Sequence, residues 1–259
     1  MDLGLRGKRA LVTGASKGIG AAIAEVLAEE GCHLLLAARS AAALDALAKR
    51  LRAAHHVEAR AHVADLRKRE DVERLAESAA DIDILVNNAG DIPAGSLGQV
   101  GEETWRHGWE LKVFGYINLT RQVYARMKTR GGGVIVNDIG AAGEHYDFNY
   151  IAGSTGNAAL MAFTRALGGR SLADNIRVVG VNPGPVETQR IVTLMKGIAR
   201  NRLGDESRYR ELMARFPLGR PATTREIADV IAFLASPRSS YTSGVVVTID
   251  GGMCASSGL

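Results

Sequence analysis

Short apolar runs rich in β-branched residues alternate along the chain with longer stretches in which apolar and polar positions follow a helical period. Because the short runs contain few polar positions, they are typical of strands covered on both faces, as in a parallel sheet. The runs that predict strands are residues 9–12, 33–37, 58–63, 84–86, 134–137, 177–181 and 245–249. The stretches that predict helices are residues 21–30, 41–53, 72–79, 104–130, 158–172 and 226–235.

The regular alternation of strand and helix predicts an α/β fold. Right-handed crossovers give a doubly wound, Rossmann-type domain with a central parallel sheet of about seven strands flanked by helices, and a ligand crevice at the carboxyl ends of the strands. Gly31 and Gly131 each follow a helical stretch, as left-handed helix caps do. No linker, charge block or low-complexity segment divides the 259 residues, so we expect a single domain, 1–259.

Composition narrows the classes of function. The apolar share of 46% and the charged share of 23% are ordinary for a globular protein. Cys32 and Cys254 form neither a CxxC pair nor a cluster with histidine, so we expect no metal site, no disulfide and a reducing, cytoplasmic setting. We find no apolar segment typical of a signal peptide or a membrane span, and we expect no membrane partner. The net charge is +4, but scattered basic residues and 5% aromatics argue against nucleic acid.

A glycine-rich turn follows the first predicted strand and opens a helix at once. Glycines allow a tight turn and a close approach of the backbone to a pyrophosphate, while the helix N-terminus offers free N–H groups and a partial positive charge. The strand–turn–helix context is what this motif requires, so residues 13–20 predict a dinucleotide site. The residues expected to bind the cofactor here are Gly14, Ser16, Lys17, Gly18, Ile19 and Gly20.

The end of the second predicted strand indicates which dinucleotide is bound. Dehydrogenases that use NAD usually place an acidic residue there for the ribose 2′-hydroxyl. This chain has Arg39 instead, and Lys17 lies in the glycine turn, so two cations favour the extra 2′-phosphate of NADP over NAD. The alternative is that Arg39 is a solvated residue at a strand end.

With further motifs, the sequence resembles the short-chain dehydrogenase/reductase family over essentially its whole length. Asp65-Leu66, after the third predicted strand, matches the family's adenine-contacting aspartate. Residues 87–90 are similar to its Asn-Asn-Ala-Gly motif, and residues 182–188 to its nicotinamide-side loop. Residues 217–220 through 250–252 are also similar. The resemblance implies a small-molecule carbonyl or alcohol substrate. It also implies cofactor contacts from Asp65, Leu66, Asn88, Ala89, Gly90, Pro183, Gly184, Val186 and Thr188.

The catalytic positions that the resemblance implies are all substituted. In the family, tyrosine donates the proton, serine holds the carbonyl oxygen, lysine binds ribose and lowers the tyrosine pKa, and asparagine orders a relay water. The alignment places Lys112 at the asparagine, Gly140 at the serine, Gly153 at the tyrosine and Asn157 at the lysine. The interval from Gly140 to Gly153 equals the family's serine-to-tyrosine spacing, which supports this register.

Lys112 and Asn157 are the two residue types of the family's asparagine and lysine, exchanged between positions. In the family these side chains face one another through a water. The exchanged pair therefore predicts an ammonium and an amide in one polar pocket, with Lys112 supplying charge and Asn157 binding ribose or water. Coincidence, with Lys112 an ordinary charged helix residue, is the alternative.

Tyr150 is the candidate replacement for the proton donor. It lies three residues before Gly153 and would share its face on a helix, where the missing bulk at Gly140 and Gly153 lets the ring lean in. His145 and Tyr146 are further candidates in the same loop. Tyr150 has the alternative of a packing or subunit-interface role.

Two further interpretations concern the start of this helix. Aligning Tyr150 directly with the family tyrosine puts Ser154 at the lysine position and needs three extra residues before Asn157. Gly153 and Gly156 each weaken a helix by about 1 kcal/mol relative to alanine. We therefore expect the helix to begin nearer Asn157, with Ser154 or Thr155 as its cap.

Residues 188–217 correspond to the family's mobile substrate lid. Their excess of cations favours an acidic or acyl-thioester-type substrate, and a solvated helix face of mixed charge is the alternative. The cations are Arg190, Lys196, Arg200, Arg202, Arg208, Arg210 and Arg215, against Glu187, Asp205, Glu206 and Glu211.

Two functions follow from these observations. The first is an NADP(H)-dependent oxidoreductase with a non-standard active site built on Lys112, Tyr150 and Asn157. The second is a catalytically silent NADP-binding protein that senses cofactor state or acts through association. The helices at 104–130 and 158–172 correspond to the family's interface helices, which implies a homo-oligomer, a tetramer or a dimer.

Overall fold

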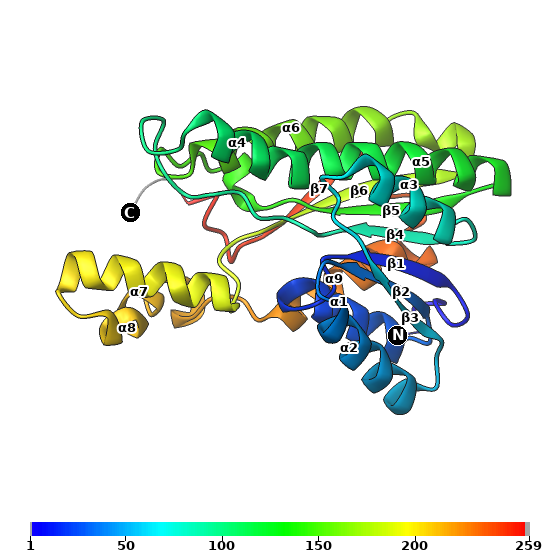
Figure 1. Cartoon of the computed structure of the whole chain (residues 1–259), viewed down its shortest axis with the longest axis horizontal. Coiled ribbons are helices and arrows are strands. Elements are labelled where there is room, and N and C mark those ends of the chain that lie inside the picture. The colour runs from blue at the N-terminus through cyan, green and yellow to red at the C-terminus, as the bar shows by residue number, and fades with distance from the viewer. Residues whose placement is uncertain (1, 257–259) are drawn as a thin grey trace.

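The computed structural model describes residues 2–256 and has a twisted parallel sheet of seven strands between two layers of helices (Figure 1). The strands lie in the order β3-β2-β1-β4-β5-β6-β7, so chain order reverses between β1 and β4. This confirms the predicted fold class, and the reversal marks the point where doubly wound sheets bind ligands. The strands are β1 Arg9–Thr13, β2 His33–Ala38, β3 Ala59–Val63, β4 Ile84–Asn87, β5 Gly133–Asp138, β6 Ile176–Pro183 and β7 Val246–Ile249.

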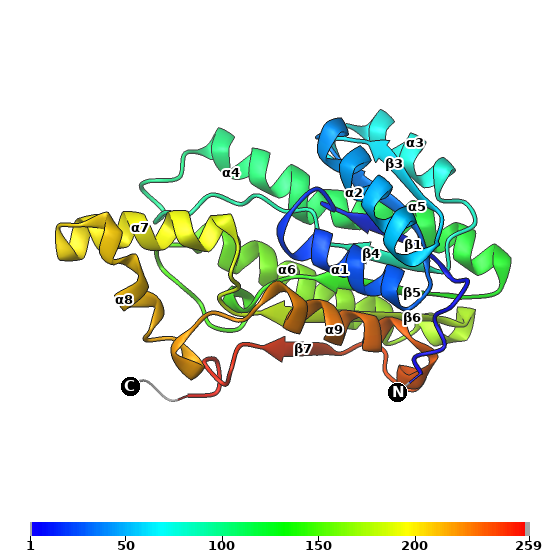
Figure 2. The same ribbon diagram turned by 90° about the horizontal axis from the view of Figure 1, so that it is seen from below.

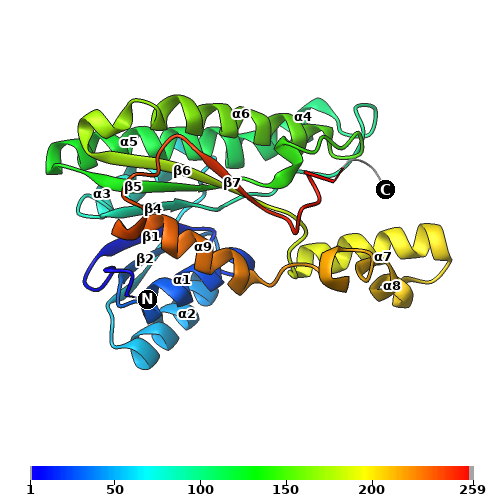
Figure 3. The same ribbon diagram turned by 180° about the vertical axis from the view of Figure 1, so that it is seen from behind.

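Six of the helices cover the two faces of the sheet (Figures 1 and 3). One face carries α1 (Gly18–Glu29), α2 (Ala41–His55) and α9 (Thr224–Ala235), and the other carries α3 (Arg69–Ser78), α5 (Gly115–Arg130) and α6 (Ile151–Gly168). Helix α4 (Glu102–Trp109) precedes α5, and Gly108 is its one buried residue. Strand β1 is buried on both sides: Ala10 and Val12 pack in the core under α1 and α9, whereas Leu11 packs in the core under α3 and α5. Burial on both faces is why the strand has no polar alternation.

The helix expected over residues 104–130 is interrupted. Between α4 and α5 the chain forms a π-helical turn, Glu110–Phe114, with Lys112 at its centre. Single π-helical turns inside α-helices are rare and frequently occur at functional sites. The indole N–H of Trp109 donates to the Ala152 carbonyl at 2.9 Å, which links the end of α4 to the start of α6.

The expected start of α6 near Asn157 is wrong. The helix begins at Ile151, and neither Ser154 nor Thr155 caps it. The Ser154 hydroxyl instead accepts the Asp147 N–H at 3.1 Å. Close packing outweighs the weak helix propensity: at Gly156 an added Cβ would lie only 3.1–3.3 Å from Trp109, Val113 and Ile92.

The segment expected to form a lid contains two helices, α7 (Gln189–Leu203) and α8 (Tyr209–Met213). They project beyond the carboxyl edge of the sheet (Figures 1 and 2). Met195, Ala199, Leu212 and Met213 form a small apolar core between them. Within residues 2–256, no helix is both long and apolar enough to cross a membrane.

Candidate active site

The glycine turn is fastened to the loop that follows β4. The Thr13 hydroxyl accepts the N–H groups of Asn88 and Ala89 at 2.9 and 3.1 Å, and the Asn88 amide donates to the Thr13 carbonyl at 2.7 Å. Gly14 has φ +67°, and an added Cβ would lie 2.7 Å from the Asn88 amide nitrogen. Gly20 also packs directly against Asn88. These contacts give the turn its fixed shape.

The N-terminus of α1 is open toward the crevice. Lys17 is its N-cap residue in an extended conformation, and no side chain caps the helix. An added Cβ on Gly18 would meet only Thr188, at 3.5 Å. Uncapped N–H groups at a helix N-terminus bind phosphate groups, so this cradle fits a dinucleotide pyrophosphate. Ser16 and Ile19 are partly buried beside it.

The side of the crevice where we expect adenosine carries four charged side chains. The Asp65 carboxylate accepts hydrogen bonds from Arg67 Nε at 2.8 Å and Arg67 Nη2 at 2.6 Å, and this pairing lowers the pKa of Asp65. The charge of Arg39 lowers it further, while both Arg39 and Lys17 are exposed. Leu66 is buried, and an added Cβ on Gly115 would lie 3.2 Å from its Cβ. Sequence reasoning missed Arg67, although its proximity to Asp65 was a usable signal.

The loops after β4 and β6 form the side of the crevice where we expect the nicotinamide. An added Cβ on Gly90 would lie 2.8 Å from Lys112 Cδ, so the lysine stem rests on this glycine. Pro183 ends β6, and Gly184 packs against Asp250. Val186 is buried and forms a bridge with Ala222.

Lys112 and Asn157 bind neighbouring backbone carbonyls just after β5. The Lys112 ammonium donates to the Ile139 carbonyl, and the Asn157 amide donates to the next carbonyl, that of Gly140, at 3.2 Å. Gly140 has φ +127°, and an added Cβ would lie 2.9 Å from the Asn157 amide nitrogen. Asn157 is 3% exposed, and its side-chain oxygen has no hydrogen-bond partner among residues 2–256. The two side chains therefore share one polar region.

Asp138 is the counter-ion beneath this region. Burial lowers the pKa of Lys112 to about 8, the charge of Asp138 raises it, and the charge of Arg190 lowers it. Burial also raises the pKa of Asp138 to about 6, against the lowering effect of Lys112. Tyr116, in the first turn of α5, donates its hydroxyl to the Asp138 carbonyl at 2.8 Å. Sequence reasoning missed Asp138, although an acidic residue at the end of a buried strand was the available signal.

Tyr150 fills the space that a side chain at Gly153 would occupy. An added Cβ on Gly153 would overlap the Tyr150 ring at Cε1 and Cζ. Tyr150 is the N-cap residue of α6, so the ring reaches this space from the preceding loop. Its hydroxyl accepts a hydrogen bond from Arg190 Nη2 at 3.2 Å, and the same nitrogen donates to the Ile92 carbonyl at 2.7 Å. His145 and Tyr146 are exposed.

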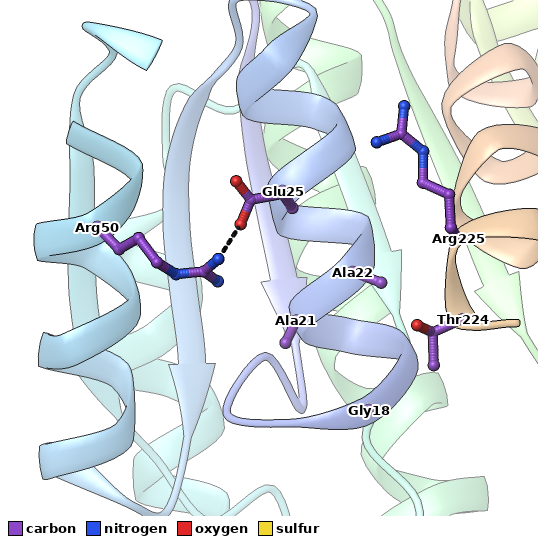
Figure 4. Close-up of a pocket in the computed structure, with 7 residues that line it drawn as sticks. All are labelled: Gly18, Ala21, Ala22, Glu25, Arg50, Thr224 and Arg225. Atoms are coloured by element: carbon purple, nitrogen blue, oxygen red, sulfur yellow. Dashed lines mark ion pairs between the residues drawn. The ribbon is translucent and has the colours of Figure 1, made fainter. Parts of the chain in front are cut away.

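A separate pocket of about 290 Å³ runs along the outer side of α1, between α2 and α9 (Figure 4). Glu25 pairs with Arg50 at 2.7 Å and with His55 at 2.8 Å, while Glu29 pairs with Arg225 at 2.8 Å. Because each carboxylate already has a basic partner, this cluster serves to tie the three helices together.

A parallel sheet with a glycine turn and an open helix N-terminus at its switch point defines the dinucleotide-binding proteins of the Rossmann type. A family model described as "Enoyl-(Acyl carrier protein) reductase" matches residues 14–254. The 3-oxoacyl-(acyl-carrier-protein) reductase of Aquifex aeolicus is 31% identical over 257 residues, covering 98% of this chain and 100% of that protein. L-xylulose reductase of Mesocricetus auratus is 31% identical, covering 97% of this chain and 98% of that protein.

Solved structures agree with these relatives. L-sorbose reductase from Gluconobacter frateurii, complexed with NADPH and L-sorbose, shares 33% identity at a TM-score of 0.92, covering 99% of this chain and 100% of that one. Actinorhodin polyketide ketoreductase with NADPH shares 30% identity at a TM-score of 0.90, covering 96% and 97%. The chain belongs to the short-chain dehydrogenase/reductase family of oxidoreductases.

Proposed function

We propose that the protein is an NADP(H)-dependent oxidoreductase that transfers hydride between the nicotinamide and a carbonyl or alcohol substrate, using a rebuilt active site. The observation that carries the proposal is the Tyr150 ring, which occupies the place of a side chain on Gly153 and turns its hydroxyl to Arg190. A phenol from a different position in the chain thus lies beside Gly153, the position that the alignment matches to the family tyrosine.

The preference for NADP over NAD rests on charge. Lys17 and Arg39 are both exposed beside the adenosine end of the crevice, where a 2′-phosphate would add negative charge. The L-sorbose reductase and the polyketide ketoreductase named above were both solved with NADPH. We propose that one domain provides the whole site, and that copies of the chain associate into a homo-oligomer.

Bound NADPH supplies the hydride, and the remaining roles fall to side chains of this chain. Tyr150 donates its hydroxyl proton to the carbonyl oxygen, and Arg190 orients that hydroxyl through its hydrogen bond. General acid catalysis of this kind contributes about 10²–10⁴ in rate. The Lys112 ammonium stabilises the negative charge that develops on the oxygen. Asn157 positions the Gly140 backbone and offers its unpartnered oxygen to a water.

A second candidate, a catalytically silent NADP-binding protein, is favoured by one observation. The Lys112 ammonium is hydrogen-bonded to the Ile139 carbonyl, and no lysine contacts the Tyr150 hydroxyl within the described chain. Such a protein would bind NADPH without oxidising it. Its function would lie in sensing the cofactor or in association with another chain.

The test is titration of the purified protein with NADPH and NADH, followed by a panel of ketones, aldehydes and alcohols. We expect enzyme-dependent NADPH oxidation with some carbonyl, and at least a tenfold loss of kcat in Tyr150→Phe and in Lys112→Ala. Tyr241→Phe, at a side chain that is 98% exposed, and Lys49→Ala on α2 are matched controls that keep full activity.

Two outcomes would contradict the proposal in different ways. Full activity in both Tyr150→Phe and Lys112→Ala would remove this mechanism while leaving an oxidoreductase. Tight NADPH binding with no turnover across the panel would favour the silent cofactor-binding protein instead.

A further inference from the structure

Arg190 is a cation at the candidate active site with no acidic partner in the described part of the chain. Within that part only its Nη2 atom is used, donating to the Ile92 carbonyl and the Tyr150 hydroxyl. Among residues 2–256, no carboxylate lies within ion-pair distance of this guanidinium, whereas Arg200 and Arg208 of the same lid pair with Glu206 and Glu211. Because a guanidinium has five N–H donors, Arg190 keeps donors free for a ligand.

The charges around Arg190 do not cancel. Asp138 is the carboxylate that faces Lys112, and its charge is offset by that lysine. Arg190 is close enough for its charge to lower the pKa of Lys112, so Lys112, Asp138 and Arg190 together carry one positive charge in excess. Helix α7 adds to this excess, because Arg190 lies in its first turn and Thr188 gives it no side-chain cap. The excess positive charge and the uncapped N-terminus of α7 both attract an anionic group placed here.

Arg190 is also placed beside the reacting group. Its guanidinium carbon lies 5.8 Å from the centre of the Tyr150 ring, and its Nη2 lies 3.2 Å from the hydroxyl that we assign as proton donor. A carbonyl oxygen that accepts the Tyr150 proton therefore lies near the guanidinium. An anionic group bound by the remaining Arg190 donors is then close to that carbonyl within one small substrate.

We infer that the substrate is a 2- or 3-oxo acid, with its carboxylate bound by Arg190 and its nearby ketone carbonyl presented to Tyr150. This inference rests on the proposed function and names its substrate class. Reduction of the oxo acid to the hydroxy acid uses one NADPH and one proton: hydride goes to the carbonyl carbon, the Tyr150 proton goes to the oxygen, and NADP⁺ is released. A guanidinium suits this role because its Nε and Nη1 donors, which Ile92 and Tyr150 do not use, give charge-assisted hydrogen bonds to a carboxylate.

The first experiment compares each oxo acid with its neutral ester. We expect 2-oxobutanoate or 3-oxobutanoate to have at least a tenfold higher kcat/KM than its methyl ester in the wild-type protein. Arg190→Gln lowers kcat/KM for the acid by about ten- to a hundredfold, the range for losing a charge-assisted hydrogen bond, and removes the preference over the ester. Arg190→Lys retains part of the preference. Arg202→Gln, at the far end of α7, is the matched control and retains all of it.

The second experiment measures binding without turnover. Oxamate, which carries a carboxylate beside an unreactive carbonyl, is titrated calorimetrically into the NADPH-loaded protein, with oxamide and inorganic phosphate as comparisons. We expect oxamate to bind at least tenfold more tightly than oxamide, and Arg190→Gln to abolish the difference. Phosphate binding as tight as oxamate would overturn the assignment of a carboxylate.

The outcomes separate this inference from the proposed function. NADPH-dependent reduction of neutral carbonyls with no preference for acids overturns the inference and leaves the oxidoreductase. The absence of any turnover, together with Arg190-dependent oxamate binding, overturns the oxidoreductase and supports the carboxylate site. Equal binding of oxamate and oxamide overturns the inference whether or not the protein is an enzyme.

Discussion

Replacement of Gly153 by alanine measures how firmly Tyr150 occupies the active site. Alanine normally stabilises a helix relative to glycine by up to about 1 kcal/mol. At Gly153, however, the new Cβ overlaps Cε1 and Cζ of the Tyr150 ring, and overpacking of this kind costs about 1–3 kcal/mol. We therefore expect Gly153→Ala to lower the free energy of unfolding by up to about 2 kcal/mol and to reduce NADPH turnover, because the ring must leave its place.

Two variants isolate the clash from the propensity of alanine. Gly197→Ala in α7 has nothing within 4 Å of the new Cβ, so it gains the propensity without a clash. In the Tyr150→Ala background the ring is gone, and Gly153→Ala then stabilises as Gly197→Ala does. Urea unfolding of the four proteins in this cycle yields the coupling between Tyr150 and Gly153, which we expect at about 1–3 kcal/mol. If Gly153→Ala stabilises the wild type as much as Gly197→Ala and retains full turnover, the placement of Tyr150 is wrong.

The remaining predictions concern charge. Burial sets the pKa of Lys112 at about 8, so activity that needs its ammonium falls as pH rises through about 8 in a kcat profile, and Lys112→Met lacks that limb. The stability of the fold depends on pH in the opposite direction. Between about pH 8 and pH 10.5 the unfolded chain binds more protons at Lys112 than the folded chain, so the contribution of Lys112 to the free energy of unfolding rises with pH. Arg39→Glu raises the Kd for NADPH at least tenfold in fluorescence titrations and leaves NADH binding intact, because only NADPH has the 2′-phosphate. Lys49→Glu makes the same charge change on α2, and an equal loss of NADPH affinity there would refute a local role of Arg39.

The parts of the fold that sequence could predict are those fixed by local patterning. Strand β1 and its glycine turn follow each other directly, and burial of the strand on both faces removes polar alternation. The sequence also indicates Tyr150 as a candidate proton donor, because the missing bulk at Gly153 is visible in it. The exchange of Lys112 and Asn157 was visible too, since both belong to motifs with fixed spacing.

The parts that sequence could not predict depend on contacts between distant residues. The sequence marks Arg190 only as one cation of the lid, because its contact with the Ile92 carbonyl joins residues 98 positions apart. The early start of α6 depends on how closely Gly156 packs against Trp109 and Val113, which outweighs helix propensity. The π-helical turn could not be predicted from hydrophobic periodicity, because one extra residue in one turn changes the pattern too little to be detected in a window of helix length.

That single extra residue has a genetic consequence. In a continuous α-helix, one residue inserted or removed rotates everything on one side of the change by about 100°. A π-helical turn instead absorbs one extra residue, so deletion of one residue within Glu110–Phe114 would let the backbone close into a continuous α-helix from α4 into α5 with the two helices still in register. The Lys112 ammonium would nevertheless swing off the Ile139 carbonyl. The position of this lysine therefore depends on the number of codons in this stretch of the gene as well as on the lysine codon itself. A one-codon deletion is a route by which the site is lost while the fold survives.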